Sequence, residues 1–177
     1  MKSIKEKIVD SQTELKKVLG TDNVMALPRL VRVVVSVGVG KNRDKKRNEL
    51  ITDRISKITG QKASPRGAKK SIAGFKLREG EIVGYATTLR GDRMYGFLDK
   101  LINVAIPRMR DFRGIDPKCI DEMGNMTMGL KEHTIFPEAA DEDLRDVFGL
   151  AVTLVSTAKD KKSALAFFKS IGVPFKK

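Results

Sequence analysis

The stretch Leu30-Val31-Arg32-Val33-Val34-Val35-Ser36-Val37 decides how this chain folds. Branching at Cβ restricts the valine side chain in a helix and suits the pleated backbone of a strand, so these residues predict a strand. Because side chains alternate across a strand, the valines at odd positions share one face, and Arg32 and Ser36 lie on the other. The pattern indicates a sheet with one apolar face and one face that carries polar groups.

Two later segments repeat this alternation. Residues 82–90 predict a strand that carries Thr88 and Arg90 among small residues on one face, and residues 150–157 predict a strand with one apolar face and one face of small and hydroxyl residues. A further short strand is expected at residues 130–135, and loops are expected at residues 113–129. The small and hydroxyl-bearing faces could approach a sugar-phosphate backbone closely, or they could simply be solvated.

Helices are expected around these strands, because apolar residues recur there with helical spacing. The expected ranges are residues 4–19, residues 45–59 before Gly60, residues 92–106 between a cap at Asp92 and Pro107, and residues 161–171 between Asp160 and Gly172. We therefore predict an α+β fold in which residues 1–177 form a single domain. Its sheet would be mostly antiparallel, with helices packed on one face, an open RNA-binding face on the other, and a protruding basic loop.

Charge is concentrated in one part of the chain. Residues 25–91 hold 16 of the 35 Lys and Arg residues but only 5 of the 22 Asp and Glu residues. Packed like charges repel one another and destabilise a compact state, whereas a polyanion would neutralise them and release counterions. Nucleic acid is therefore the favoured partner, and a solvated basic face kept for solubility is the alternative.

Other features bound the class of protein. The lone Cys119 cannot form an internal disulfide, no apolar run approaches 18 residues, and residues 1–10 lack the hydrophobic segment of a signal peptide. We expect a soluble cytoplasmic protein. An acidic group is interpreted either as a solvated helix start or as a docking site for a basic protein; it consists of Asp141, Glu142, Asp143 and Asp146.

Catalytic signals are weak. Gly38-Val39-Gly40 follows a strand, but the third glycine of a dinucleotide fingerprint would fall at Arg43, so the motif fails. The single His133 has no Cys or Ser near it in the sequence and is interpreted as a strand residue rather than a general base. We predict no catalytic residue, no cofactor and no metal site.

A basic glycine-containing segment lies between the second helix and the second long strand. It runs Lys69-Lys70-Ser71-Ile72-Ala73-Gly74-Phe75-Lys76-Leu77-Arg78-Glu79-Gly80. Its cations suit phosphate, and its Ile72 and Phe75 suit an exposed arm that reaches RNA. An ordinary mobile hairpin loop is the alternative.

This segment and several other motifs resemble one family along nearly the whole chain. The motifs are Ser36-Val37-Gly38-Val39-Gly40, Thr59-Gly60-Gln61-Lys62, Thr88-Leu89-Arg90-Gly91-Asp92-Arg93-Met94-Tyr95, Pro107-Arg108-Met109-Arg110-Asp111-Phe112-Arg113-Gly114, Met128-Gly129-Leu130-Lys131-Glu132, Ile135-Phe136-Pro137-Glu138 and Gly172-Val173-Pro174-Phe175-Lys176-Lys177. Their order and spacing resemble the bacterial form of the fifth protein of the large ribosomal subunit.

The resemblance implies a non-enzymatic role in the large ribosomal subunit. The family binds 5S rRNA, helps to attach it in the central protuberance, contacts P-site tRNA, and bridges to small-subunit protein thirteen. Further partners implied are 23S rRNA and the 5S-binding large-subunit proteins eighteen and twenty-five.

The family's 5S contacts match Gln61 and Thr88 here, and its usual Asn is replaced by Ser36. We therefore predict a 5S rRNA site formed by Arg32, Ser36, Gln61, Lys62, Thr88 and Arg90. The matching tRNA-facing loop would use Lys69, Lys70, Ser71, Phe75, Lys76 and Arg78.

Two other functions fit the sequence less well. An RNA-recognition module would need a strand with the aromatic pattern of that fold, which is not present in a chain with only two Tyr and no Trp. An RNA-modifying enzyme would need a cofactor loop or a cluster of His, Cys and carboxylates, and the sequence suggests neither.

Overall fold

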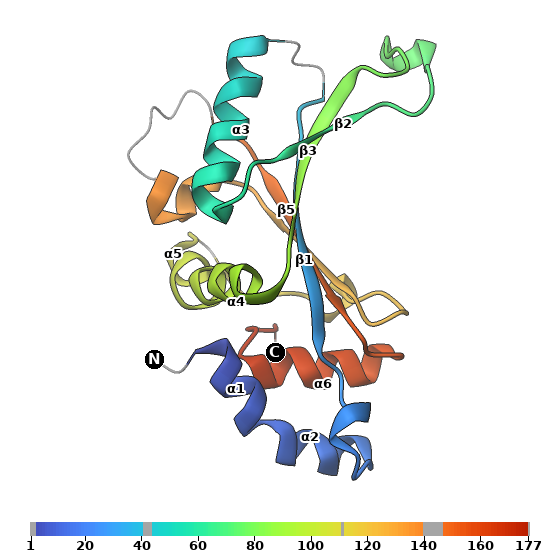
Figure 1. Ribbon diagram of the computed structural model, residues 1–177, viewed down its shortest axis with the longest axis vertical. Helices are drawn as coiled ribbons and strands as arrows, with labels where there is room; N and C mark the ends of the chain where they lie inside the picture. The colour runs from blue at the N-terminus through green and yellow to red at the C-terminus, as the bar shows by residue number, and fades with distance from the viewer. Residues whose placement is uncertain (1–2, 41–43, 111, 140–146, 177) are drawn as a thin grey trace. The chain divides into compact units, whose positions relative to one another are not determined.

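The computed structural model describes residues 3–40, 44–110, 112–139 and 147–176 of the chain (Figure 1). It confirms the predicted α+β class: five strands form an antiparallel sheet in the order β2-β3-β1-β5-β4. The strands are β1 (Leu30–Gly38), β2 (Ser64–Gly67), β3 (Ile82–Leu89), β4 (Met126–Leu130) and β5 (Leu150–Ser156). The helices are α1 (Ile4–Asp10), α2 (Gln12–Leu19), α3 (Lys45–Thr59), α4 (Gly91–Lys100), α5 (Ile106–Arg108) and α6 (Lys161–Ile171).

The chain is organised as two compact units. The first unit comprises residues 1–33, 90–128 and 153–177, and the second comprises residues 34–89 and 129–152. The assignment of the whole chain to a single domain stays a prediction.

The predicted alternation in β1 and β5 is confirmed by burial. Val33, Val35 and Val37 are buried in β1, whereas Arg32 is exposed and Ser36 is half-buried. In β5 the residues Leu150, Val152 and Leu154 are buried, and the intervening residues are half-buried. Val31, expected on the apolar face, is instead 43% exposed, close to the start of its strand.

In the first unit, the single helix expected at residues 4–19 is divided into two. α1 and α2 meet at Ser11, whose hydroxyl donates to the carbonyl oxygen of Ile8 at 3.1 Å, a local bond that competes with regular helix geometry. Both helices contact α6. Ile4 and Leu15 are buried as the spacing predicts, but Val18 is 68% exposed.

The third predicted helix begins earlier and ends later than expected. Arg90 stands at the cap position of α4, and Asp92 lies in the first helical turn, where its carboxylate forms an ion pair with Lys5. The helix continues through a π-helical turn (Leu101–Ala105) into α5, which contains Pro107. Pro107 lies just after this π-helical turn, where the regular hydrogen-bond pattern of the α-helix is already interrupted, so it does not end the helix. The apolar face is confirmed as buried: Met94, Phe97, Leu98, Leu101, Ile102 and Ala105.

The strand expected at residues 130–135 is wrong in position. β4 ends at Leu130 and occupies residues expected to be a loop, while His133–Ile135 form a 3-10 turn. Burial alternates along β4, with Met126, Met128 and Leu130 inside. The exposed Thr127 lies beside Thr153 of β5, and their hydroxyl oxygens are 3.0 Å apart.

In the second unit, α3 buries Ile51, Ile55 and Ile58, as the spacing predicts, and packs on β3. β2 is an edge strand that no residue pattern predicts. It pairs antiparallel with β3, from Ser64 opposite Ala86 to Gly67 opposite Ile82. All four of its residues are exposed, so β2 has no apolar alternation, and its Pro65 suits an edge position.

The helices of the described ranges do not cross a membrane. None of them has both the length and the apolar content that crossing a bilayer requires.

Candidate nucleic-acid interface

The end of α3 fixes the position of Gln61. Gly60 ends the helix in the left-handed conformation, with φ at 67°, and its N–H donates to the carbonyl oxygen of Ser56 at 2.8 Å. The hydroxyl of Thr59 donates to the carbonyl oxygen of Ile55 at 2.7 Å and accepts the N–H of Gln61 at 3.3 Å. The backbone of Gln61 is thus held against the last turn of the helix.

Gln61 and Thr88, two of the residues matched to the family's 5S contacts, lie together. Nε2 of Gln61 donates to the carbonyl oxygen of Thr88 at 3.4 Å. The β2–β3 pairing extends only to Ala86, so this bond serves a backbone acceptor beyond the last residue of β3 that pairs with β2. Both residues are half-buried and therefore remain partly accessible.

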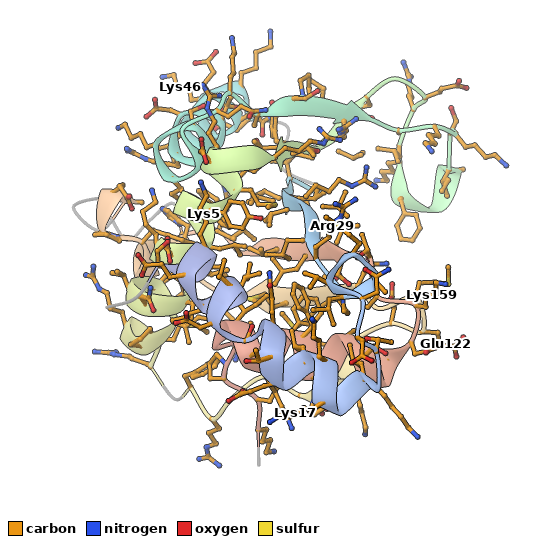
Figure 2. The ribbon with its side chains drawn as sticks, turned by 60° about the horizontal axis from the view of Figure 1, so that its bottom comes forward. Lys5, Lys17, Arg29, Lys46, Glu122 and Lys159 are labelled. Carbon is orange, nitrogen blue, oxygen red and sulfur yellow. The ribbon has the colours of Figure 1, made fainter. Side chains whose placement is uncertain are left out.

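The other predicted 5S residues are also accessible. In the second unit, Ser36 is half-buried on β1 and Lys62 is exposed directly after Gln61. In the first unit, Arg32 is exposed on β1 and Arg90 is exposed just after β3, at the start of α4 rather than within a strand. Cationic side chains extend into solvent elsewhere as well, among them Arg29, Lys46 and Lys159 (Figure 2).

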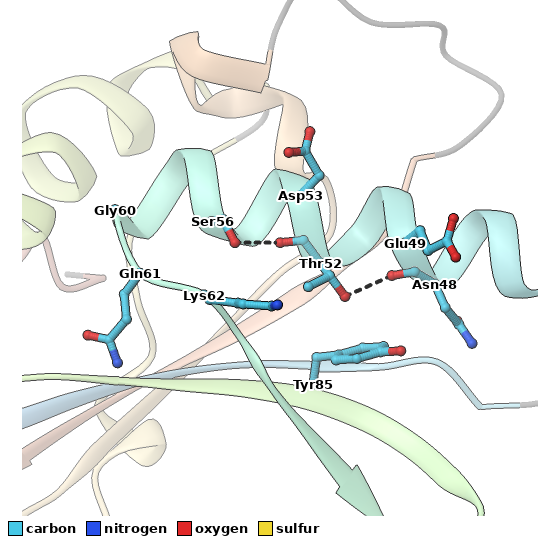
Figure 3. A pocket seen from close by; sticks show the side chains of 9 residues that line it. All are labelled: Asn48, Glu49, Thr52, Asp53, Ser56, Gly60, Gln61, Lys62 and Tyr85. Atoms are coloured by element: carbon cyan, nitrogen blue, oxygen red, sulfur yellow. Dashed lines mark hydrogen bonds between the residues drawn. The ribbon is translucent and has the colours of Figure 1, made fainter.

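A groove in the second unit adjoins Gln61 and Lys62 (Figure 3). It has a volume of about 560 Å³ and is lined by Asn48, Glu49, Thr52, Asp53, Ser56, Gly60, Gln61, Lys62 and Tyr85. On α3, the Thr52 hydroxyl donates to the Asn48 carbonyl oxygen at 2.9 Å, and the Ser56 hydroxyl donates to the Thr52 carbonyl oxygen at 2.8 Å. No motif selects these polar residues, although their spacing of four places them on one side of a helix.

The basic segment forms the end of the β2–β3 hairpin, residues 68–81, and has a defined backbone. Ile72 and Leu77 exchange two backbone hydrogen bonds of 3.0 and 3.2 Å around a 3-10 turn (Ala73–Phe75). Lys76 follows that turn with φ at 51°, a conformation uncommon for a residue other than glycine. The Ser71 hydroxyl accepts the N–H of Glu79 at 2.9 Å, so it serves the hairpin's own structure.

The side chains at this hairpin end are open to solvent. Phe75 is 73% exposed and Ile72 is 46% exposed. Lys69, Lys70, Ser71, Lys76 and Arg78 are exposed as well. An exposed aromatic ring among cations is a common arrangement for contact with nucleic acid.

The single histidine, His133, packs inside the second unit. It is buried, its ring stacks on that of Phe148 with centroids 4.1 Å apart, and Nδ1 accepts the Phe148 N–H at 3.4 Å. Burial lowers the pKa of His133 below its usual 6.5, and the nearby Arg54 charge lowers it further. Within the described ranges, no group of His, Cys, Asp and Glu side chains is arranged to hold a metal ion. The acidic group at Asp141, Glu142, Asp143 and Asp146 lies outside the described residues.

Comparison with known proteins gives one consistent result. Residues 23–78 match the family model of ribosomal protein L5, and residues 82–175 match the model of the C-terminus of the same ribosomal family. The chain is 47% identical to the large ribosomal subunit protein uL5 of Heliobacterium modesticaldum, over 99% of both chains. It is 49% identical to that of Syntrophomonas wolfei over 88% of both, and 43% identical to that of Sulfurimonas denitrificans over 100% of this chain and 98% of the relative.

These matches identify the class of this protein: it is a structural protein of the ribosome, not an enzyme. The chain belongs to the ribosomal protein L5 family. The resemblance stated from the motifs is thereby confirmed. Membership places the chain in the large ribosomal subunit, which is cytoplasmic in bacteria, and gives it a role in translation alongside rRNA.

Proposed function

We propose that this chain binds 5S rRNA and helps to attach it in the central protuberance of the large subunit. The observation that carries the proposal is the hydrogen bond between Gln61 and Thr88. Two residues that are 27 positions apart in the sequence, and that were selected by their motifs, form one partly accessible polar site. The proposed 5S surface consists of this site with Ser36 and Lys62, and with Arg32 and Arg90 as further cations.

The chemistry of the site suits an RNA backbone. Gln61 uses one amide hydrogen on the Thr88 carbonyl oxygen and keeps a second hydrogen and its own oxygen for a ligand. The Thr88 and Ser36 hydroxyls can each donate to a phosphate or exchange hydrogen bonds with a ribose 2′-OH. Ser36 is shorter than the Asn usual in the family, so its contact would be weaker or bridged by water.

A second contact is proposed for the hairpin end, residues 68–81, which would meet P-site tRNA. Its exposed cations suit phosphates, and Phe75, 73% exposed on a turn closed by the Ile72–Leu77 hydrogen bonds, can meet a base or a ribose. The Ser71 hydroxyl already accepts the Glu79 N–H, so its part in that contact would be to hold the hairpin's shape.

Further partners are part of the same proposal. They are 23S rRNA, the large-subunit proteins eighteen and twenty-five, and small-subunit protein thirteen, to which the chain would bridge.

Recovery of bound RNA tests the proposed function directly. The tagged full-length chain is isolated from a bacterial lysate at low salt, and the RNA that accompanies it is sequenced. Enrichment of 5S rRNA over other structured RNA is expected. A Gln61→Ala, Thr88→Val double variant serves as the matched control and should recover much less 5S rRNA. Equal recovery of 5S rRNA and unrelated structured RNA would contradict the proposal.

A further inference from the structure

The groove beside Gln61 contains three polar side chains that lack partners within the described part of the chain. The Asn48 side-chain oxygen is buried and accepts no hydrogen bond. The Tyr85 hydroxyl and the Lys62 ammonium group likewise have no hydrogen-bond or ion-pair partner among the described residues. Buried polar atoms are normally satisfied, so this unpartnered oxygen, on a residue that lines the groove, indicates that the Asn48 amide takes a partner there.

These three groups face the same space. Figure 3 shows the side chains of Lys62 and Tyr85 extending in parallel beneath α3, with Asn48 directed toward the same end of the groove. Tyr85 is 9% exposed, so little of its ring is available to stack on a base. The site therefore combines one cation, one amide that can both donate and accept, and one phenol.

Two of the residues that line the groove, Glu49 and Asp53, are acidic. Asp53 is paired with Lys57 at 3.0 Å, and Figure 3 shows the carboxylates of Asp53 and Glu49 directed away from Tyr85. The Glu49 charge at the rim would repel a second and third phosphate. The groove is thus suited to a ligand with one negative charge and several hydrogen-bonding groups, not to a continuous duplex backbone.

We propose that this groove holds one unpaired nucleotide of the RNA bound at Gln61 and Thr88. Lys62 contacts its phosphate. The Asn48 amide rotates to turn its unpartnered oxygen into the groove and pairs with the edge of the base, since an amide matches a base edge that offers both a donor and an acceptor. The Tyr85 hydroxyl contacts the base or the ribose. The groove volume of about 560 Å³ lies in the range of small-ligand sites. This inference rests on the proposed 5S rRNA binding, because Gln61 and Lys62 belong to both sites.

The test is chemical probing of 5S rRNA bound to the full-length chain, with reagents that modify unpaired base edges. The unchanged chain should shield one unpaired base. An Asn48→Ala, Tyr85→Phe double variant should bind 5S rRNA about 10-fold more weakly, and shielding should be lost at that base alone. Tyr95→Phe, at the only other tyrosine, is the matched control and should change neither measurement. Lys62→Gln, at an exposed position where folding is not at risk, should weaken binding and lower the salt dependence by about one phosphate contact.

The outcomes separate this inference from the proposed function. If the double variant binds with unchanged affinity and an unchanged footprint, the groove does not hold a nucleotide, and 5S binding itself stands. If the double variant weakens shielding uniformly over the whole RNA, the inference also fails. The substitutions would then weaken binding across the proposed 5S surface rather than at one nucleotide. If the unchanged chain does not bind 5S rRNA, both fail. Cross-linking of the groove to a basic protein instead of RNA would likewise overturn the inference.

Discussion

At the scale of single residues, Thr88 and Gln61 offer uncharged contacts whose loss can be measured. Thr88→Val keeps the side-chain shape but removes the hydroxyl, so an RNA acceptor would be left unpaired once water is excluded. We expect 5S binding to weaken by about 1–3 kcal/mol, and Gln61→Ala to cost about the same. Ser36→Ala should cost less because the serine reaches less far than the family's Asn, and Ser36→Asn should tighten binding. Filter binding with labelled 5S rRNA measures each effect.

Salt dependence provides the control for these variants. Because none of them removes a charge, the slope of affinity against salt should stay unchanged while affinity falls, in contrast to changes at Arg32 or Arg90. Each variant must also unfold at the denaturant concentration of the unchanged chain. Wild-type 5S affinity in both Thr88→Val and Gln61→Ala would show that the site was assigned wrongly.

His133 should make folding stability depend on pH. Its pKa is lowered by burial in the folded state, while the unfolded chain binds a proton near pH 6.5. Between these two pKa values the unfolded state holds more protons, so the free energy of unfolding should fall as the pH drops from 6.5 toward the folded-state pKa, and should be flat above 6.5. Urea unfolding at several pH values measures this slope. His133→Phe, which retains a ring beside Phe148, should remove the slope, since the chain has no other histidine. An equal slope in this variant would assign the pH dependence to other groups.

At the scale of elements, the hairpin end can be separated from the proposed 5S surface. Replacing Lys69, Lys70, Lys76 and Arg78 by Gln removes four cations from an exposed hairpin whose turn is held by backbone hydrogen bonds. We expect 5S affinity to change little and the variant to enter large subunits. Retention of P-site tRNA by the reconstituted ribosomes should weaken, because phosphate contacts would be lost. Loss of 5S binding in this variant would assign the hairpin end to the 5S surface instead.

The strands and helices also differ in how far they can be predicted from the sequence. β1 and β5 were predicted because burial on one face imposes a strict alternation of side chains. β2 was not, because it is an exposed edge strand held by backbone pairing to β3, and backbone pairing leaves no apolar pattern. β4 was obscured by Gly129, and the continuation of α4 past Pro107 depends on a π-helical turn that residue spacing does not reveal. The structure also explains one small residue: a Cβ at Gly84 would lie 2.7 Å from the Val37 carbonyl oxygen.

The candidate site was predictable to a similar degree. Motifs selected Gln61 and Thr88, but their hydrogen bond depends on the end of α3 and on the length of β2, which no motif encodes. Asn48 and Tyr85 were not selected, because a lone amide and a lone phenol have no signal until a fold brings them to one groove. Residue spacing predicts faces, and only tertiary structure determines which faces meet.

At the scale of the whole molecule, the distribution of charge sets how strongly binding depends on salt. The 16 Lys and Arg residues of positions 25–91 include the exposed cations of the hairpin end and of the proposed 5S surface. If about six of them meet 5S phosphates, and each contact releases about 0.7–0.9 of a counterion, a plot of log affinity against log salt should have a slope of about −4 to −5. Filter binding of the full-length chain to 5S rRNA, from low to moderate salt, measures it. A duplex RNA of the same length as 5S rRNA serves as the reference. It should bind more weakly at every salt concentration, because it cannot form the contacts that Gln61 and Thr88 make with 5S rRNA. A flat response, or equal affinity for both RNAs, would mean that these cations do not form a dedicated 5S surface.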